Sequence, residues 1–259
     1  MVKIGIIGGT GIDAPDILKN KKEIIVDTEF GKPSSLLTTG TIQGVDVVII
    51  ARHGPNHTIN PTNVPYQANI MVFKKIGCTH ILAGTAVGSL KEEIKPGDLI
   101  FTDQFIDRTT KRKQTFYEKE KVCHISVAEP FCPQLRKILG TTADELNLPN
   151  HKKGTCVVIE GPRFSTKAES FLFKSWNADT VNMTMVPECV LAREAELCYA
   201  NISMMTDYDC WKDEHVSNEM VMKTMAENVE KLKRLLIAVI PKINDGDCSC
   251  KHALKGALF

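Results

Sequence analysis

The sequence lacks any apolar run long enough to cross a membrane, and it carries almost no net charge. Its longest strongly apolar stretch is LLIAVI, residues 235–240, whereas a membrane helix needs roughly 20 apolar residues. Lysine and arginine number 32 and aspartate and glutamate 31, which gives a formal net charge of +1. Nothing therefore indicates the basic surface of a nucleic-acid-binding protein. We expect neither a membrane nor a nucleic acid as a partner.

From the sequence we also expect no secretory leader, no internal repeats and no linker. The apolar run near the N-terminus is short and broken by glycines, and no small-residue cleavage site follows it. Of the 259 residues, 43% are hydrophobic and 24% are charged, as in ordinary globular proteins. We expect a single α/β domain over residues 1–259, with a tail over 241–259, located in the cytoplasm.

Cysteine, in contrast, is abundant, with nine residues in the chain. Most lie in apolar runs such as TCVVIE and ELCYA, where a thiol is usually a small buried hydrophobic group. Cys248 and Cys250, in DCSC, instead lie on a polar tail beyond the last predicted helix. No second pair at zinc-finger spacing accompanies them, so we predict no metal site. A redox or disulfide role for the tail remains open.

Hydrophobic periodicity predicts strands that alternate with helices. The predicted strands are Ile4–Ile7, Val47–Ile50, His80–Ala83, Asp98–Phe105, Thr155–Glu160, Thr180–Asn182 and Ala200–Met204. Helices are predicted within residues 65–77, 187–198 and 218–243, and the basic stretch 107–121 is predicted to be a long surface loop. The alternation is typical of an α/β domain with a largely parallel core sheet.

The first strand runs into the glycine-rich stretch IIGGTGIDAP, which raises the question of a phosphate site. Gly9, Gly11 and Ala14 fit the spacing of a dinucleotide-binding turn. The next predicted strand, EIIVDT, begins only about a dozen residues after Thr10, too few for the crossover helix of such a site. We favour a cradle for a single phosphate, formed by backbone N–H groups and the Thr10 hydroxyl. A tight structural turn is the alternative.

Two further strand ends carry groups suited to an anion. Arg52 and His53 follow one strand, and Thr85 and Ala86 follow another; α/β sheets bind ligands at such carboxyl ends. Arginine offers a planar fork of donors to an oxyanion. The glycine and proline between His53 and His57 disfavour a helix that would bring both rings to one metal. These segments together predict an inorganic anion site without a metal.

Asp207 and Asp209, in TDYDCW, form a second polar motif. Strand alternation would place both side chains on the same face. A surface turn, a manganese site and a pair of acceptors facing a ligand are all compatible with the pair. The apolar run before it and Trp211 after it disfavour an open turn, and no further cluster of carboxylates or histidines requires a metal.

The stretches IGIIGGTGI, ARHG, NVPYQANI, GCTHIL, DQFIDRTT, AEPFCP, IEGPRFST, NMTMVPE and TDYDCW occur in this order between about Lys3 and Ile240. Together they resemble the trimeric purine nucleoside phosphorylase family, and within it the branch that cleaves 5′-methylthioadenosine. The resemblance implies a three-layer α/β/α fold with a mixed central sheet and a homotrimer. It also implies that inorganic phosphate is a co-substrate and that no cofactor takes part.

The resemblance also implies roles for individual residues. The family's phosphate contacts would fall on Thr10, Arg52, His53, Thr85, Ala86 and Thr184. Its nucleoside contacts would fall on Met183 under the ribose, Phe164 and Ser165 at the purine, Asp207 at N7, Asp209 at the exocyclic amine, His57, Val221 and Met222 at the 5′ group, and His124 from a neighbouring subunit.

These residue types suit phosphorolysis. The departing base needs a proton, so Asp207 must have a raised pKa, and the apolar segment ISMM before it favours one. Asp209 as an acceptor would select 6-amino over 6-oxo purines. A broader purine nucleoside phosphorylase and a catalytically silent binding protein are the alternatives. Polar Asn218 departs from the apolar residue expected near the 5′ group. We favour a position facing solvent; if it faced the pocket, 5′-hydroxyl substrates such as adenosine would be tolerated better.

The cysteine-bearing tail differs from that of the animal members and resembles the C-terminal Cys-x-Cys of some archaeal ones. Cys132 with Cys198, and Cys248 with Cys250, are the pairs whose disulfide state the sequence leaves open.

Overall fold

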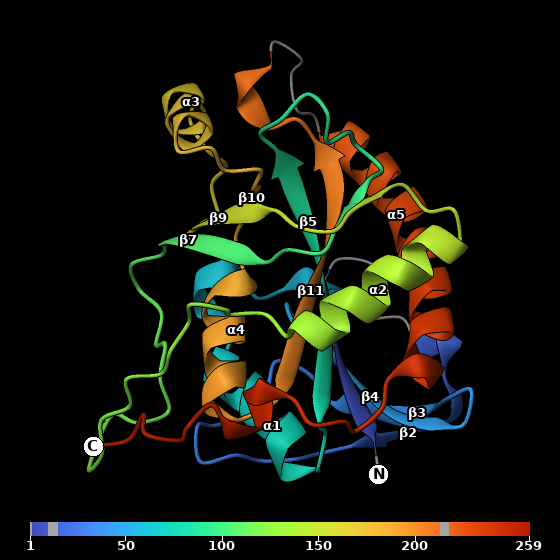
Figure 1. Ribbon diagram of the computed structural model, residues 1–259, viewed down its shortest axis with the longest axis vertical. Coiled ribbons are helices and arrows are strands. Elements are labelled where there is room, and N and C mark those ends of the chain that lie inside the picture. Colours follow the sequence, from blue (N-terminus) through green and yellow to red (C-terminus); the bar gives the residue numbers. More distant parts are fainter. Residues whose placement is uncertain (1, 10–14, 213–217) are drawn as a thin grey trace.

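The computed structural model describes residues 2–9, 15–212 and 218–259, apart from the side chains of residues 218, 220 and 221. Its centre is a mixed sheet (Figure 1). The strands are β1 (Lys3–Gly8), β2 (Lys19–Ile24), β3 (Leu37–Ile42), β4 (Val45–Ala51), β5 (His80–Ser89), β6 (Leu99–Ile100), β7 (Gln104–Arg108), β8 (Asn150–His151), β9 (Thr155–Ile159), β10 (Thr180–Asn182) and β11 (Cys198–Asp207).

The strand order is β2-β3-β4-β1-β5-β10-β9-β7, with β11 paired to β5 and β6, and β8 paired to β6. Strand β5 is the centre of this arrangement. It runs parallel to β1 and β11, and its last residues pair antiparallel with β10. The neighbour of β5 on one side therefore changes from β1 to β10 along its length, and the sheet opens between them.

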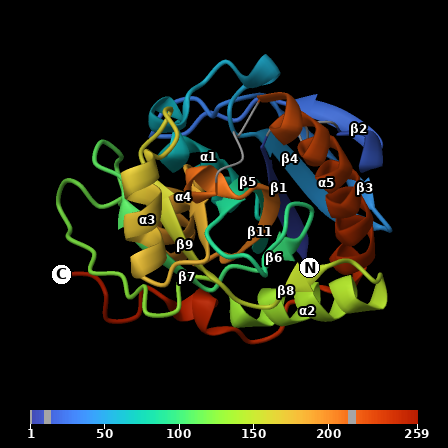
Figure 2. The same ribbon diagram turned by 90° about the horizontal axis from the view of Figure 1, so that it is seen from above.

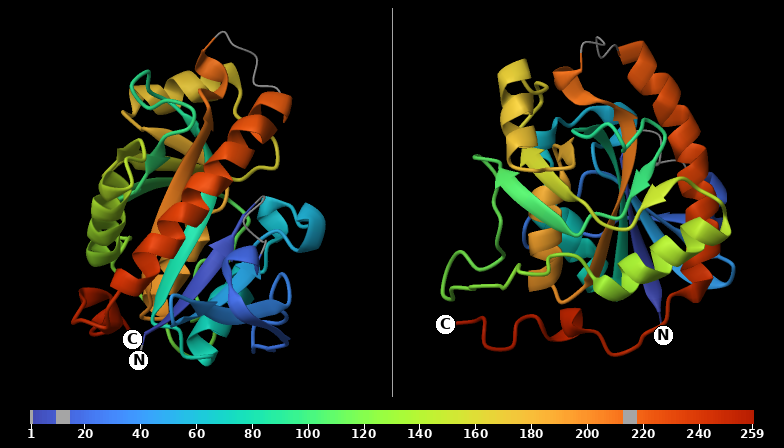
Figure 3. Two further views of the ribbon diagram at one scale, coloured as in Figure 1. Left: turned by 90° about the vertical axis from the view of Figure 1, so that its right-hand side faces the viewer. Right: turned by 45° about the horizontal axis from the view of Figure 1, so that its top comes forward.

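The five described α-helices are α1 (Tyr66–Lys75), α2 (Pro133–Glu145), α3 (Lys167–Ser175), α4 (Met185–Glu194) and α5 (Asn218–Val239). Helices α1 and α4 cover one face of the sheet, and α2 and α5 cover the other (Figure 2; Figure 3). Alternation along β4 shows why: Val47 and Ile49 pack with the core of α2 and α5, whereas Val48 and Ile50 pack with that of α1 and α4. The expected three-layer α/β/α fold with a mixed sheet is confirmed.

Several predicted elements need correction. The single strand predicted over Asp98–Phe105 is two strands, because β6 pairs with β11 and β8 while β7 pairs with β9. Strand β2 covers Lys19–Ile24 rather than EIIVDT; five of its six residues are exposed, so it lacks an apolar alternation. Strands β3 and β8 and helices α2 and α3 were not predicted. Helix α4 begins at Met185, two residues before the predicted start at Pro187.

The first βα-type connection also differs from that of a dinucleotide-binding fold. Among the described residues between β1 and β2, the only helical element is a 3₁₀ turn at Pro15–Ile17. None of the helices formed by the described residues is both long and apolar enough to span a membrane.

The C-terminal tail is packed against the body rather than free. Cys248 and Cys250 are only 3% and 2% exposed, although the tail around them is polar in sequence. Its last residues pair with the long loop that precedes α2: the His124 N–H donates to the Ala257 carbonyl at 2.9 Å, and the Phe259 N–H donates to the Val122 carbonyl at 3.0 Å. Residues 122–124 therefore lie beside the C-terminus (Figure 1).

Candidate active site

A cavity of about 420 Å³ opens where the neighbour of β5 changes from β1 to β10. Its lining includes most of the residues that the sequence predicts: Arg52, His53, His57, Thr85, Ala86, Phe164, Ser165, Met183, Thr184, Asp207 and Asp209. Thr85 and Ala86 lie inside the long β5 rather than after its end. Ala86 is nevertheless exposed towards the cavity, because the sheet has opened at that point. This is the crevice at which α/β sheets bind ligands.

Arg52 follows β4 and is 1% exposed, and its charge is matched by Glu188 of α4. Its Nε and Nη2 donate to Glu188 Oε1 and Oε2 at 2.5 and 2.9 Å, and Nη1 donates to the Gly84 carbonyl at 3.0 Å. Tyr199 also donates to Glu188 Oε2 at 2.9 Å. The guanidinium fork thus binds Glu188, which leaves only part of its donors for an anion. Two of its five N–H groups remain for a ligand.

His53 has a defined tautomer. Its Nδ1 lies 2.8 Å from the Ile59 carbonyl, which can only accept, so Nδ1 carries the proton. Burial, followed by the charge of Arg52, lowers the pKa of His53 to about 4. The ring stacks on His57 with centroids 4.3 Å apart. The two histidines do come together, through a 3₁₀ turn at Pro55–His57, as stacked rings.

Asn182, at the end of β10, joins two walls of the cavity. Its Oδ1 accepts from the backbone N–H groups of Thr184 and Met185, both at 2.7 Å, and its Nδ2 donates to the Ala86 carbonyl at 3.2 Å. Asn182 therefore positions two of the predicted phosphate contacts. The sequence analysis missed it, because its partners are backbone atoms of segments that only the fold brings together.

Arg112 is a second residue that the sequence analysis missed. It comes from the long loop between β7 and α2, and its side chain is fully buried. It donates to the carbonyls of Met183 and Val186 at 2.6 and 2.7 Å and to that of Glu160 at 2.6 Å. The basic loop thus holds the segment that carries Met183 and Thr184, and this arginine is not part of a solvated face.

Asp207 and Asp209 line the cavity together, but not for the predicted reason. Strand β11 ends at Asp207, and Asp209 begins a 3₁₀ turn with φ 50°, so strand alternation does not place them. Asp207 accepts from the Thr206 hydroxyl and from the Asp209 N–H, both at 2.7 Å. A Cβ at Gly88 would lie 3.1 Å from Asp207 Oδ1, so glycine allows this close approach.

No cation pairs with either carboxylate among the described residues. Asp209 is 7% exposed, and its Oδ2 has no hydrogen-bond partner in the described part of the chain. Burial raises the pKa of both Asp207 and Asp209. This end of the cavity can therefore hold a proton or receive a donor from a ligand.

Some predicted residues are largely exposed or lie outside the cavity. Phe164 lines the cavity but is 63% exposed. Met222, on α5, is 59% exposed and does not line the cavity. His124 is also exposed and packs edge-on against Phe259 instead. Thr10 and the side chains of Val221 and Asn218 lie outside the described residues.

Known proteins resemble this chain over nearly its full length. Residues 3–241 match the model of the phosphorylase superfamily. The S-methyl-5′-thioadenosine phosphorylase of Danio rerio is 57% identical over 249 residues, which cover 93% of this chain and 89% of that protein. The protein of the same name from Pyrococcus horikoshii is 51% identical over 256 residues, with 98% of each covered.

Solved structures agree with this relationship. Methylthioadenosine phosphorylase from Schistosoma mansoni, in complex with adenine, has a TM-score of 0.95 at 40% identity and covers 99% of both chains. A variant of the adenosine/methylthioadenosine phosphorylase of that organism, in complex with methylthioadenosine, has a TM-score of 0.93 at 41% identity and covers 99% of this chain and 97% of its own. The chain therefore belongs to the phosphorylase superfamily, as a member of its S-methyl-5′-thioadenosine phosphorylase family.

Proposed function

We propose that the protein catalyses the phosphorolysis of 5′-methylthioadenosine to adenine and 5-methylthioribose 1-phosphate. One observation carries the proposal: a half-buried carboxylate, Asp207, and a buried one, Asp209, share one cavity with Arg52 and His53, and no cation from the described residues pairs with either. Breaking a glycosidic bond in this way needs an immobilised anion on one side of the ribose and a proton on the departing base.

At the phosphate end, the remaining N–H groups of Arg52 and the hydroxyls of Thr85 and Thr184 would hold the anion. These groups are buried, so their hydrogen bonds to phosphate replace those of water without reorganisation. Neutral His53, with its proton fixed on Nδ1, would use Nε2 to accept from a protonated phosphate oxygen. Holding the nucleophile below the ribose also removes the entropy cost of the encounter.

At the base end, Asp207 would supply the proton to N7. Its pKa is raised by burial, which favours the protonated form that this step requires. The Oδ2 atom of Asp209, which lacks a partner among the described residues, would accept from the exocyclic amine of adenine. A 6-oxo purine would instead place a carbonyl against this acceptor and leave both unpaired.

The assembly, the cofactor and the location are also part of this proposal. A homotrimer would bring His124 of a neighbouring copy to the cavity and would cover the exposed Phe164. Inorganic phosphate would be the co-substrate, without a cofactor. All nine cysteines are free thiols, as expected in the reducing cytoplasm.

The decisive experiment measures adenine release from 5′-methylthioadenosine with and without phosphate, beside adenosine and inosine. We expect phosphate-dependent release that strongly favours the methylthio substrate. Comparable release from adenosine would support an enzyme with broader specificity. The similar Schistosoma mansoni protein is named adenosine/methylthioadenosine phosphorylase, after both substrates. The absence of release from every substrate would contradict the proposal.

A matched pair of variants tests the assignment of Asp209. Asp209→Asn should lose selectivity for 6-amino purines, because an amide can donate to a 6-oxo group as well as accept from an amine. Asp46→Asn removes an exposed carboxylate on β4 and should leave the ratio of adenosine to inosine cleavage unchanged. Equal ratios in both variants would remove Asp209 from substrate selection.

A further inference from the structure

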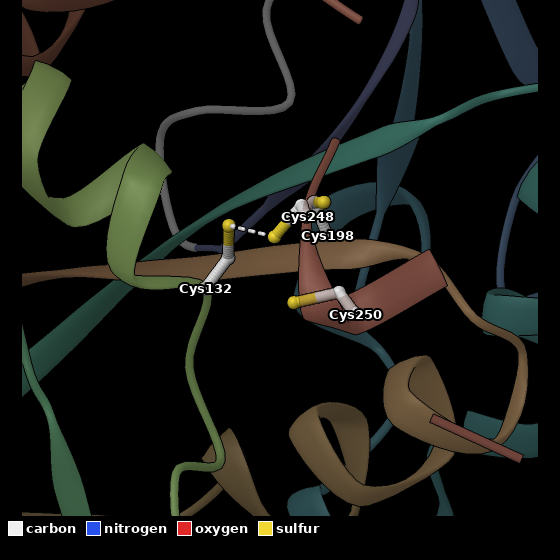
Figure 4. Close-up of side chains that lie close together, drawn as sticks. All are labelled: Cys132, Cys198, Cys248 and Cys250. Atoms are coloured by element: carbon white, nitrogen blue, oxygen red, sulfur yellow. Dashed lines mark hydrogen bonds between the residues drawn. The ribbon is translucent and has the colours of Figure 1, made fainter. Parts of the chain in front are cut away.

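Four cysteines gather at the end of the sheet away from the cavity. Cys132 precedes α2, Cys198 begins β11, and Cys248 and Cys250 belong to the C-terminal tail. Asp207, in the cavity, lies at the opposite end of the same strand β11. Figure 4 shows the four side chains converging from these three segments. All four are buried free thiols.

The spacing of the sulfur atoms is that of a metal site. The four Sγ atoms all lie within 4.8 Å of one another, and those of Cys132 and Cys248 are 3.6 Å apart. A tetrahedral zinc ion with Zn–S bonds of about 2.3 Å requires sulfur atoms separated by about 3.8 Å. A small inward movement of the side chains would therefore complete the coordination sphere.

The chemistry of the donor set agrees with the spacing. An all-sulfur, tetrahedral, buried set is typical of a structural zinc site, because a catalytic zinc keeps one position open for water or substrate. The backbone N–H of Leu135, in the first turn of α2, points at Cys132 Sγ at 3.5 Å. Such a donor at a helix N-terminus stabilises a thiolate.

We propose that Cys132, Cys198, Cys248 and Cys250 bind one zinc ion in a structural tetrathiolate site that fastens the C-terminal tail to α2 and the sheet. On binding, the four thiols lose four protons to solvent and form four Zn–S bonds. No electrons are transferred, so no oxidant is required. The absence of a zinc-finger spacing is no obstacle, because the fold rather than the local sequence brings the ligands together.

The first experiment measures metal in the full-length protein, purified without chelators, by inductively coupled plasma mass spectrometry. We expect about one zinc per chain. Cobalt added to the metal-free protein should give the intense visible bands and thiolate-to-metal charge-transfer bands of a tetrahedral tetrathiolate site.

A matched pair of variants tests whether zinc binding depends on the four-cysteine cluster or on buried thiols in general. Cys250→Ala should lose nearly all bound zinc, whereas Cys78→Ala, which removes a buried thiol outside the cluster, should retain it. A chelator should lower the melting temperature of the wild type and of Cys78→Ala, but not that of Cys250→Ala. If Cys250→Ala fails to fold, metal content and cobalt spectra of the wild type still decide the question.

Two results would overturn the proposal. One is wild-type protein that contains no zinc and gives no cobalt bands while all four thiols are reduced. The other is peptide mapping under non-reducing conditions that finds these cysteines joined in disulfides, in protein prepared from zinc-replete cells.

Discussion

The two ends of the cavity handle buried charge in opposite ways. At the phosphate end, Arg52 is buried together with its counter-ion Glu188, which also accepts from Tyr199. At the base end, Asp207 is half-buried and Asp209 is buried, both among neutral partners, with no cation beside them in the described part of the chain. One end keeps a permanent ion pair, and the other keeps a pair of acids with raised pKa values.

The difference shows how a protein can build a site for two chemical steps. A buried charge that is paired keeps its ionisation state, whereas an unpaired carboxylate in a similar environment favours its proton. The phosphate end therefore keeps a constant positive charge for an anion. The raised pKa values at the base end favour the protonated form that a general acid needs.

The largest effect is expected from removing the acid at the base end. Asp207→Asn cannot give a proton to N7 as an acid does, so we expect kcat for 5′-methylthioadenosine to fall by about 10²–10⁴-fold. The KM for phosphate should change little, because the phosphate end is untouched. Steady-state kinetics test this, with Asp46→Asn as the exposed-carboxylate control. An equal loss in both variants would contradict the role of Asp207.

The next largest effect is expected from removing the counter-ion of Arg52. Glu188→Gln leaves Arg52 charged, buried and without its counter-ion, so the free energy of unfolding should fall by about 3–5 kcal/mol. Glu118→Gln breaks the exposed pair with Lys113, whose side chains are 40% and 65% exposed; it should cost no more than about 1 kcal/mol. Urea unfolding measures both. Similar losses in the two variants would show that burial does not matter at this pair.

A smaller effect, on the KM for phosphate, is expected from removing Asn182 at the phosphate end of the cavity. Asn182→Ala leaves the N–H groups of Thr184 and Met185 without their acceptor, which costs about 1–3 kcal/mol and loosens the phosphate end. We expect the KM for phosphate to rise more than the KM for the nucleoside. Asn228→Ala removes a buried asparagine that donates to the Met205 carbonyl, and it should destabilise the protein without raising the KM for phosphate.

The smallest effect concerns pH. The pKa of Asp209 lies above its ordinary value of 3.8, so the folded protein binds this proton more tightly than the unfolded chain. The resulting stability is fully present below pH 3.8 and is lost as pH rises through the raised pKa. Asp209→Asn removes this dependence, and asparagine tolerates the positive φ at this position.

The variant should therefore gain stability over the wild type as pH rises from 4, by about 1.4 kcal/mol for each unit of the shift. Urea unfolding of both proteins between pH 4 and pH 8 measures the difference. A constant difference across this range would mean that Asp209 titrates normally, and the contrast between the two ends of the cavity would then rest on Asp207 alone.

Much of the fold could be predicted from local patterns. Helix α5 matches its prediction closely, because its periodic apolar stripe is independent of its neighbours, and the bounds of strand β10 also agree with the prediction. Strand β2 gave no such pattern, since it lies at the sheet edge with exposed lysines. The strand predicted over Asp98–Phe105 is broken because its two halves pair with different partners. Pairing of this kind has no local signature.

The candidate site divides in the same way. Arg52, His53 and the two aspartates could be found because chemically distinctive residues follow apolar strands. The residues that orient them, Glu188 and Asn182, could not be assigned, because their contacts cross most of the chain. Arg52 and Glu188 are 136 residues apart.

By itself, the sequence determined the α/β class, the types of groups at the ends of the central strands and the resemblance to a phosphorylase family. Only the tertiary structure decided that Arg52 is paired with Glu188 and that the two carboxylates have no cation from the described residues. It also brought four cysteines from three segments to one point. The physical reason is that periodicity records which face of an element is buried. Hydrogen bonds, ion pairs and sulfur clusters depend on distances between segments far apart in the chain.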